Sequence, residues 1–398
     1  MPKRHKALVN SRVLQWAREA AGLEVKEASK AADVGADVLS RWEAGAEQPS
    51  LAQARRLAEV YRRPLAALFL PRPPAEPKPP RDFRRFDTGE RTVYSAELRL
   101  LIRKTRNRQD WARARRLELG WRPLEFVGAW REPKNAAALA KEIRECAQFP
   151  LSAQLGASDA DQVFRDWLVA IERAGAFVTR DASVSPTEAR GFALCDPVAP
   201  FIYVNPKDSK GGRLFTLLHE FVHIWLGESG VSNDAVGGEY PSGAGAIERF
   251  CNAVAAETLV PMAAFGERWS TRPGSPANAG RVIDEASREF KVSREVIARR
   301  LLEMGELSQP DYLRLRAGYA AEWTAQQQRA RKRPGGPSYY TLRASQAGRA
   351  LGRSVFEALR ARDLSERDAA DLLEVKVGHL GRMRAEFQRS APGAEADN

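Results

Sequence analysis

The stretch His219-Glu220-Phe221-Val222-His223 constrains this chain more than any other. It follows Leu214-Phe215-Thr216-Leu217-Leu218, a largely apolar approach that predicts the first half of a buried helix. Residues four apart share one face of a helix, so both imidazoles can reach the same metal ion. Glu220 lies about 100° further round the helix and can face the metal without binding it. The alternative is a polar helix face whose histidines cap or pair with neighbours, but the apolar surroundings favour a metal site.

A second predicted helix, residues 248–260, offers a further ligand and ends before Pro261. Glu248 and Asn252 share one face of it, so a carboxylate can reach the metal while the amide oxygen accepts the free N–H of His219. A catalytic zinc site keeps three protein ligands and one open position. Glu248 could instead be a solvated glutamate, and three other acidic residues compete for its role: Asp234, Glu239 and Glu257.

These two stretches resemble the ImmA/IrrE family of metallopeptidases. The likeness rests on Phe215–His223 and on the pattern Glu248-x-x-x-Asn252-x-x-Ala255-Ala256-x-x-Leu259-x-Pro261. Residues 191–194 and 200–205 also resemble the strand pair that leads into that family's zinc helix. The chain departs from the family pattern at three positions expected to be packing: Cys251, Val254 and Val260.

The resemblance implies a Zn2+ cofactor, with His219, His223 and Glu248 as ligands and Glu220 as the general base. It implies a mainly helical, gluzincin-like domain with a small β-sheet. The oxyanion stabiliser is not identified by the sequence, and Tyr240 and Arg249 are candidates only because they are near in sequence.

Residues 1–70 predict a bundle of short helices. A helix over 10–20 stops at Gly22, a second covers 25–32, and a third covers 36–44 after a turn at 33–35. Two helices joined by a three-residue turn with glycine form the helix-turn-helix pattern. The stretch Leu39-Ser40-Arg41-Trp42-Glu43-x-Gly45-x-x-x-Pro49-Ser50-Leu51 resembles the XRE (lambda-repressor-like) family, and the likeness extends to Phe69.

In the resembled fold the start of the third helix faces the bases of double-stranded DNA. The corresponding residues here are Ala36, Asp37, Ser40 and Arg41, with Val38 beside them. Arg41 can contact guanine, whereas Asp37 would face phosphate or a cytosine amine. DNA is therefore one predicted partner, and protein docking or homodimer formation is the alternative.

Composition adds weaker constraints. Lys+Arg 63 against Asp+Glu 51 gives a formal charge of +12, which favours polyanionic partners or only solubility. The chain has no apolar run of membrane-spanning length, and its basic N-terminus lacks the apolar segment of a secretory signal. Three cysteines without C-x-x-C spacing indicate a reducing cytoplasm.

The predicted fold class is α+β, in five segments: a helix-turn-helix domain at 1–70, a Pro-rich linker at 71–81, a helical Arg-rich region at 82–160, the zinc domain at 161–330 and a helical C-terminal domain at 338–389. In the Arg-rich region Trp111, Trp121 and Trp130 are interleaved with arginines, which favours a solvated helix face with core tryptophans; a nucleic-acid surface is the alternative. Residues 228–246 predict a mobile loop over the cleft, and the sheet edge could accept a substrate strand. Residues 282–305 predict a second helix-turn-helix-like pair of structural role, 331–337 a basic linker, and 390–398 a disordered tail.

The resulting functional hypothesis is a zinc endopeptidase coupled to a DNA-binding regulator. By resemblance its substrate is a bacterial repressor or an antitoxin- or toxin-like partner. A second hypothesis is a transcriptional regulator whose zinc domain is a sensor or scaffold, and a third is an antitoxin that acts by binding.

Overall fold

A computed structural model describes residues 6–74, 81–82, 94–132, 135–232, 244–270, 279–330 and 338–389. The fold is α+β, as the sequence predicts: many helices accompany one small mixed sheet. The chain divides into two compact units. The N-terminal unit comprises Met1–Pro79 and Arg91–Lys104, and the second unit comprises Pro80–Glu90 and Thr105–Asn398. None of the helices in the described ranges has the length and apolarity that a bilayer span requires.

The N-terminal unit confirms the predicted helix-turn-helix. Its helices are α1 (Ser11–Ala21), α2 (Val25–Ala31), α3 (Ala36–Glu43), α4 (Leu51–Val60) and the short η1 (Leu65–Phe69). The Asn10 side chain caps α1, which ends at Gly22 with a φ of 72°. Leu14, Leu39 and Leu57 form part of its core. Arg18 of α1 makes a paired contact with Glu43 of α3, at 2.8 and 2.9 Å, and so ties the two helices together.

Helix α5 (Ala96–Glu118) carries most of the Arg-rich region, and here the prediction of a solvated face with core tryptophans is partly wrong. Arg108 is buried and donates to the Leu372 carbonyl at 3.0 Å and to Glu374 at 3.0 Å. Arg116 is buried too and donates to the Gly175 carbonyl at 2.8 Å. Trp121 is 46% exposed rather than in the core. The sequence could not indicate this, because the partners of these arginines lie far along the chain.

The sheet has the order β1-β5-β3-β4-β2. Its strands are β1 (Arg81–Asp82), β2 (Phe177–Thr179), β3 (Gly191–Leu194), β4 (Phe201–Val204) and β5 (Gly230–Ser232). Strand β3 is antiparallel to both β4 and β5, whereas β2 and β1 are parallel to their neighbours.

Two sequence expectations change at this sheet. Gly230–Ser232, predicted within a loop, form β5, and residues 233–243 of that loop lie outside the described residues. Arg81, at the end of the predicted linker, pairs with Gly230. The outer strand on that side of the sheet is therefore β1, and addition of a substrate strand at a sheet edge stays a prediction.

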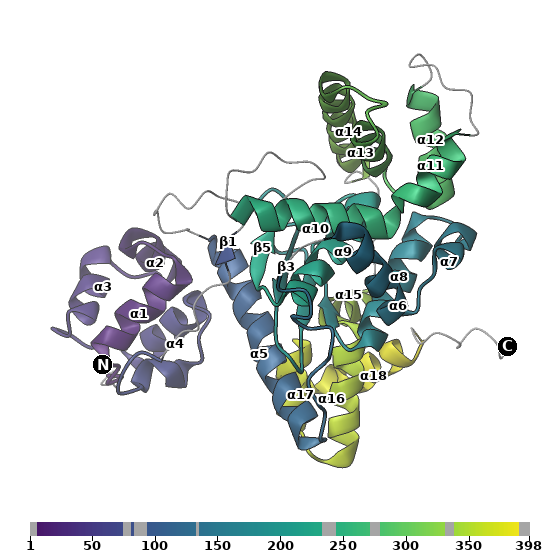
Figure 1. The fold of residues 1–398 in the computed structure, drawn as a ribbon. Helices are drawn as coiled ribbons and strands as arrows, with labels where there is room; N and C mark the ends of the chain where they lie inside the picture. Colours follow the sequence, from purple (N-terminus) through teal and green to yellow (C-terminus); the bar gives the residue numbers. More distant parts are fainter. Residues whose placement is uncertain are drawn as a thin grey trace. The chain divides into compact units, whose positions relative to one another are not determined.

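The further helices of the second unit up to residue 330 are α6 (Ala136–Ala147), α7 (Leu151–Gly156), α8 (Ala160–Ala174), α9 (Lys210–Leu226), α10 (Ala244–Leu259), α11 (Met262–Ser270), α12 (Ala279–Phe290), α13 (Arg294–Glu303) and α14 (Gln309–Ala330). Of these, α8 and α9 pack against the sheet. Helix α9 packs on β3 and β4 and also contacts α8 and α10 (Figure 1). Ser209 caps its start and Gly227, with a φ of 76°, ends it. Every side chain of α9 from Leu214 to Leu226 is buried, so this helix is the centre of the core.

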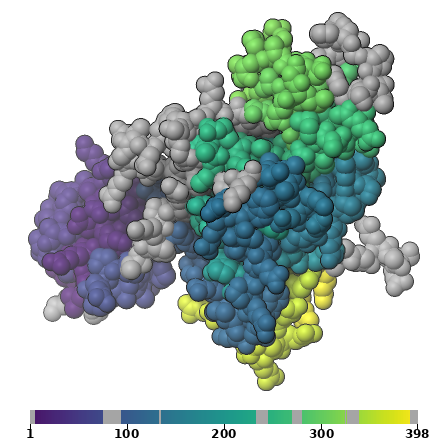
Figure 2. All heavy atoms as spheres, viewed as in Figure 1, coloured from purple at the N-terminus to yellow at the C-terminus, as the bar shows by residue number. Residues whose placement is uncertain are grey.

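The C-terminal segment forms α15 (Tyr339–Ala347), α16 (Arg349–Ala361), α17 (Glu366–Leu373), the short η3 (Val377–His379) and α18 (Leu380–Arg389). These helices (yellow-green) lie beside α5 (blue) in Figure 2, in keeping with the ion pair of Arg115 with Asp363 at 2.8 Å. Gly348, at a φ of 84°, lies so close to β2 that a Cβ there would be 2.1 Å from the Val178 carbonyl oxygen. The predicted linker 331–337 and tail 390–398 lie outside the described residues.

Candidate metal centre

The three side chains that could bind a metal meet where α9 faces α10. His219 and His223 stand one turn apart on α9, and Glu248 reaches them from α10. The two Nε2 atoms are 3.1 Å apart. The Glu248 carboxylate oxygens lie 3.1 Å from Nε2 of His219 and 3.0 Å from Nε2 of His223. All three side chains are buried, and their potential ligand atoms lie within 4.8 Å of one another.

The hydrogen bonding around His219 indicates that this cluster suits a cation. Nδ1 of His219 lies 2.9 Å from the amide oxygen of Asn252, an acceptor, so Nδ1 carries the proton and Nε2 is left with its lone pair. That lone pair faces a carboxylate oxygen and a second imidazole nitrogen inside the core, where only a cation or a proton can relieve the repulsion. A tetrahedral zinc site with Zn–N bonds of about 2.0–2.1 Å separates its nitrogens by about 3.3 Å, close to the spacing here.

The protonation of the three side chains also indicates that the cluster suits a cation. Burial opposes protonation of His219, but the contact with Glu248 outweighs it and raises the pKa of His219 to about 9. Burial lowers the pKa of His223. Burial opposes ionisation of Glu248, yet the two imidazoles hold the pKa of its carboxyl well below the usual value. The centre thus retains a carboxylate at neutral pH and favours positive charge beside it.

Glu220 lies next to this cluster and is fully buried. Gly191, the first residue of β3, packs directly against it. A Cβ on Gly191 would lie 2.7 Å from Glu220 Oε1 and 2.6 Å from Thr216 Cγ2. A residue with a side chain does not fit there unless Glu220 or Thr216 moves. The sequence identified the strand but not this role, since a glycine at a strand start carries no specific signal.

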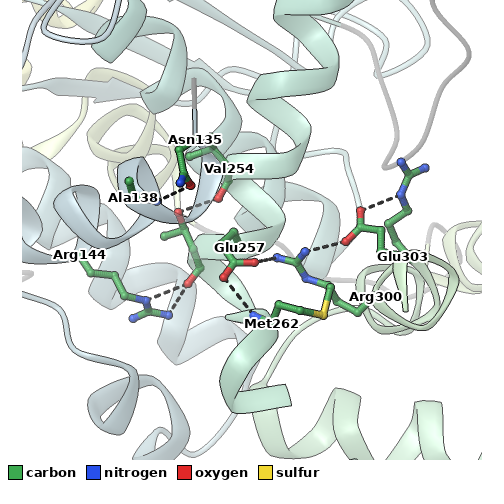
Figure 3. A network of polar contacts seen from close by, with 10 residues as sticks. Asn135, Ala138, Arg144, Val254, Glu257, Met262, Arg300 and Glu303 are labelled. Atoms are coloured by element: carbon green, nitrogen blue, oxygen red, sulfur yellow. Dashed lines mark hydrogen bonds and ion pairs between the residues drawn. The ribbon is translucent and has the colours of Figure 1, made fainter. Parts of the chain in front are cut away.

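The remaining candidates take other places. Glu257 sits at the far end of α10, where it accepts from Arg300 at 2.8 Å and from the Met262 amide at 3.0 Å (Figure 3), so it is not part of the cluster. Asp234, Glu239 and Tyr240 lie outside the described residues, and Arg249 is exposed on α10. Cys251 is buried with its sulfur 3.8 Å from His223 Nδ1, and burial holds the pKa of its thiol well above the usual value. Cys251, Val254 and Val260 are all core residues, as expected from packing positions.

The predicted DNA contacts lie together on α3 of the other unit. Asp37, Ser40 and Arg41 are exposed and Ala36 is partly exposed. Arg41 is held by two ion pairs, each of 2.8 Å, to Asp37 and to Glu47. Its hydrogen bond lowers the pKa of Asp37. The sequence did not indicate the contact with Glu47. Exposed ion pairs of this kind are weak, so DNA phosphates or bases can compete with the two carboxylates for the Arg41 guanidinium.

Comparison with known families gives two matches. Residues 171–302, which include the metal cluster and Glu220, match the family model of the IrrE N-terminal-like domain, a metallopeptidase family. Residues 11–68, which include α3, match a helix-turn-helix domain. The chain carries both domains. No curated protein and no solved structure matches it. The IrrE-like domain therefore belongs to the metallopeptidase class, while α15 to α18 lie outside both matched ranges.

Proposed function

We propose that this chain is a zinc-dependent endopeptidase of the bacterial cytoplasm that cleaves a repressor or an antitoxin-like protein. In this proposal the helix-turn-helix domain delivers it to DNA or to its target. The observation that carries the proposal is the buried convergence of His219, His223 and Glu248 with Glu220 beside them. The IrrE-like match supports the same class of chemistry.

Each residue of the centre has a role in peptide hydrolysis. Zinc held by the three side chains would supply a Lewis acid that polarises the scissile carbonyl and lowers the pKa of water to about 7. The Glu220 carboxylate takes the proton of the attacking water and delivers it to the leaving amine. Asn252 holds the Nδ1 proton of His219, so that Nε2 stays directed at the metal. Gly191 leaves the space that Glu220 occupies.

The substrate can be found by comparing cells that express the wild-type chain with cells that express Glu220→Gln. New protein N-termini are followed by mass spectrometry under DNA damage and phage infection, with the native gene neighbourhood present. A fragment of a repressor, antitoxin or toxin that forms only with Glu220 intact supports the proposal. Identical fragments in both, with DNA or partner binding retained, would make the zinc domain a sensor or scaffold.

Substituting Gly191 tests the packing against the general base. We expect Gly191→Ala to retain one zinc per chain and to cleave the substrate about 100-fold more slowly. The added Cβ would push the Glu220 carboxylate away from its position, and a displacement of about 1 Å can slow a reaction about 100-fold. Zinc content and cleavage rate are measured on the same preparation. Gly266→Ala is the matched control, since a Cβ there meets nothing within 4 Å. Full activity in Gly191→Ala would show that Glu220 does not need this position.

The helix-turn-helix domain yields a separate prediction. Arg41→Ala in the full chain should weaken binding to its DNA site about tenfold, because Arg41 is the basic side chain on the exposed face of α3. Raising salt from about 50 to 200 mM should weaken it further. Arg55→Ala, an exposed arginine on α4 of the same unit, is the control, with affinities from gel shift or fluorescence anisotropy. Unchanged DNA affinity in Arg41→Ala, together with loss of a protein partner, would favour a docking role for this domain.

A further inference from the structure

A cavity of about 500 Å³ lies in the second unit and shares no residue with the metal cluster. Its walls come from α5, α8, β2 and α16, with Trp121 at its border. The volume lies within the range of about 300–1,000 Å³ that is usual for small-molecule sites. None of the residues that line it takes part in the proposed hydrolysis.

The cavity has an excess of positive charge. Two carboxylates line it, Glu172 and Glu357, against five arginines: Arg115, Arg116, Arg173, Arg349 and Arg353. Loss of hydration raises the pKa of Glu172 to about 7, even though the amide of Ala350 and nearby arginines oppose this. That carboxyl is therefore protonated in a large fraction of molecules near neutral pH and offsets the arginines only in part.

Three of the five arginines have structural partners. Arg115 pairs with Asp363 at 2.8 Å, and Arg116 donates to the Gly175 carbonyl. Arg173 donates to the Ala147 carbonyl at 2.8 Å.

Arg349 and Arg353 differ from these. They stand one turn apart at the start of α16, and neither makes a hydrogen bond or ion pair with any residue in the described part of the chain. The positive end of the α16 dipole adds to their field. Two adjacent guanidiniums at the wall of a cavity, which share the field of the Glu172 carboxyl but make no ion pair with it, are suited to a phosphate group, which arginine binds through paired hydrogen bonds.

The cavity also has apolar lining residues, among them Leu119 and Trp121. Leu119 is 58% exposed and Trp121 is 46% exposed, although large apolar side chains are usually covered. The Arg116 guanidinium stacks on the Trp121 ring, with its carbon 4.4 Å from the ring centroid, which holds the indole in place. A flat ring system can pack against such a fixed indole.

We propose that this cavity binds a phosphorylated small molecule of nucleotide size, with the phosphate on Arg349 and Arg353 and the planar ring near Trp121. A single nucleotide satisfies both halves of the cavity, and its size fits the volume. Because α16 contributes the arginines and α5, α8 and β2 form the remainder, the ligand joins the C-terminal helices to the rest of the second unit. Binding should therefore raise the melting temperature of the full chain.

The test uses isothermal titration calorimetry and thermal denaturation of the zinc-loaded full chain with AMP, GMP, adenosine, inorganic phosphate and a short DNA duplex. We expect AMP or GMP to bind and to raise Tm, and adenosine to bind at least about tenfold more weakly because it lacks the phosphate. Arg349→Ala with Arg353→Ala should lower nucleotide affinity about tenfold or more. Arg360→Ala, on the same helix but outside the cavity, should leave affinity unchanged.

Trp121→Ala separates the two halves of the site. This variant should weaken nucleotide binding while leaving inorganic phosphate binding unchanged. Because the Trp121 side chain is 46% exposed, we expect the variant to fold. Photo-crosslinking of an azido-nucleotide to wild-type chain, mapped to residues 349–353 or to Trp121, does not depend on any variant. The proposal is overturned if neither nucleotide binds, if binding persists unchanged in the double arginine variant, or if only duplex DNA depends on these arginines.

Discussion

Glu220→Gln is expected to slow peptide cleavage by about 10²–10⁴-fold while the chain keeps its full zinc content. The carboxylate is buried beside the cluster, but among the residues that the structure describes only His219, His223 and Glu248 converge as potential ligands. Glutamine preserves the shape of the side chain and cannot accept the proton of water, so the loss falls on the chemical step.

The measurement compares the cleavage rate of the identified substrate with zinc per chain from elemental analysis. Glu125→Gln, an exposed glutamate of the same unit, is the matched control. A Glu220→Gln variant that cleaves at the wild-type rate would remove the general base from the proposal. One that loses zinc would move Glu220 into the ligand set.

Removing a metal ligand should have the second large effect. His219→Ala and Glu248→Gln are each expected to lower zinc affinity by more than about 100-fold, because each removes one of the three proposed protein ligands. Asn252→Ala should lower it about 10–100-fold, since it releases only the Nδ1 contact that orients His219.

Zinc affinity is measured by competition with a chelator, and folding by circular dichroism. Cys251→Ala is the control, because Cys251 touches His223 but is expected to serve packing. Full zinc retention in Glu248→Gln would contradict the ligand set. Loss of zinc in Cys251→Ala would show that its sulfur helps to orient His223 through Nδ1.

The local patterns of the sequence predicted most elements of the fold. The helix-turn-helix, helix α9 and the strands at 191–194 and 201–204 follow from periodicity, caps and turns, which depend on neighbouring residues. The convergence of His219 with His223 was also predictable, because their spacing places both on one helix face.

What the sequence did not indicate depends on contacts between distant segments. The burial of Arg108 requires Leu372, which is 264 residues away. The fit of Gly191 against Glu220 depends on how β3 packs on α9. The pairing of Arg81 with Gly230 depends on a residue of the predicted linker joining the sheet. The ion pair of Arg41 with Glu47 is the exception, because these residues are close in sequence and their contact depends on the turn after α3.

The contact of Gly348 with the Val178 carbonyl has a consequence for synthesis of the chain. Strand β2 is an outer strand of the sheet, and its free edge is covered by a segment that leaves the ribosome about 170 residues later. Until then, a strand with unpaired backbone groups is open to pairing with another nascent chain. The C-terminal helices thus cover the outer edge of β2 last. A chain whose synthesis stops early would have an IrrE-like domain in which the edge of β2 is uncovered.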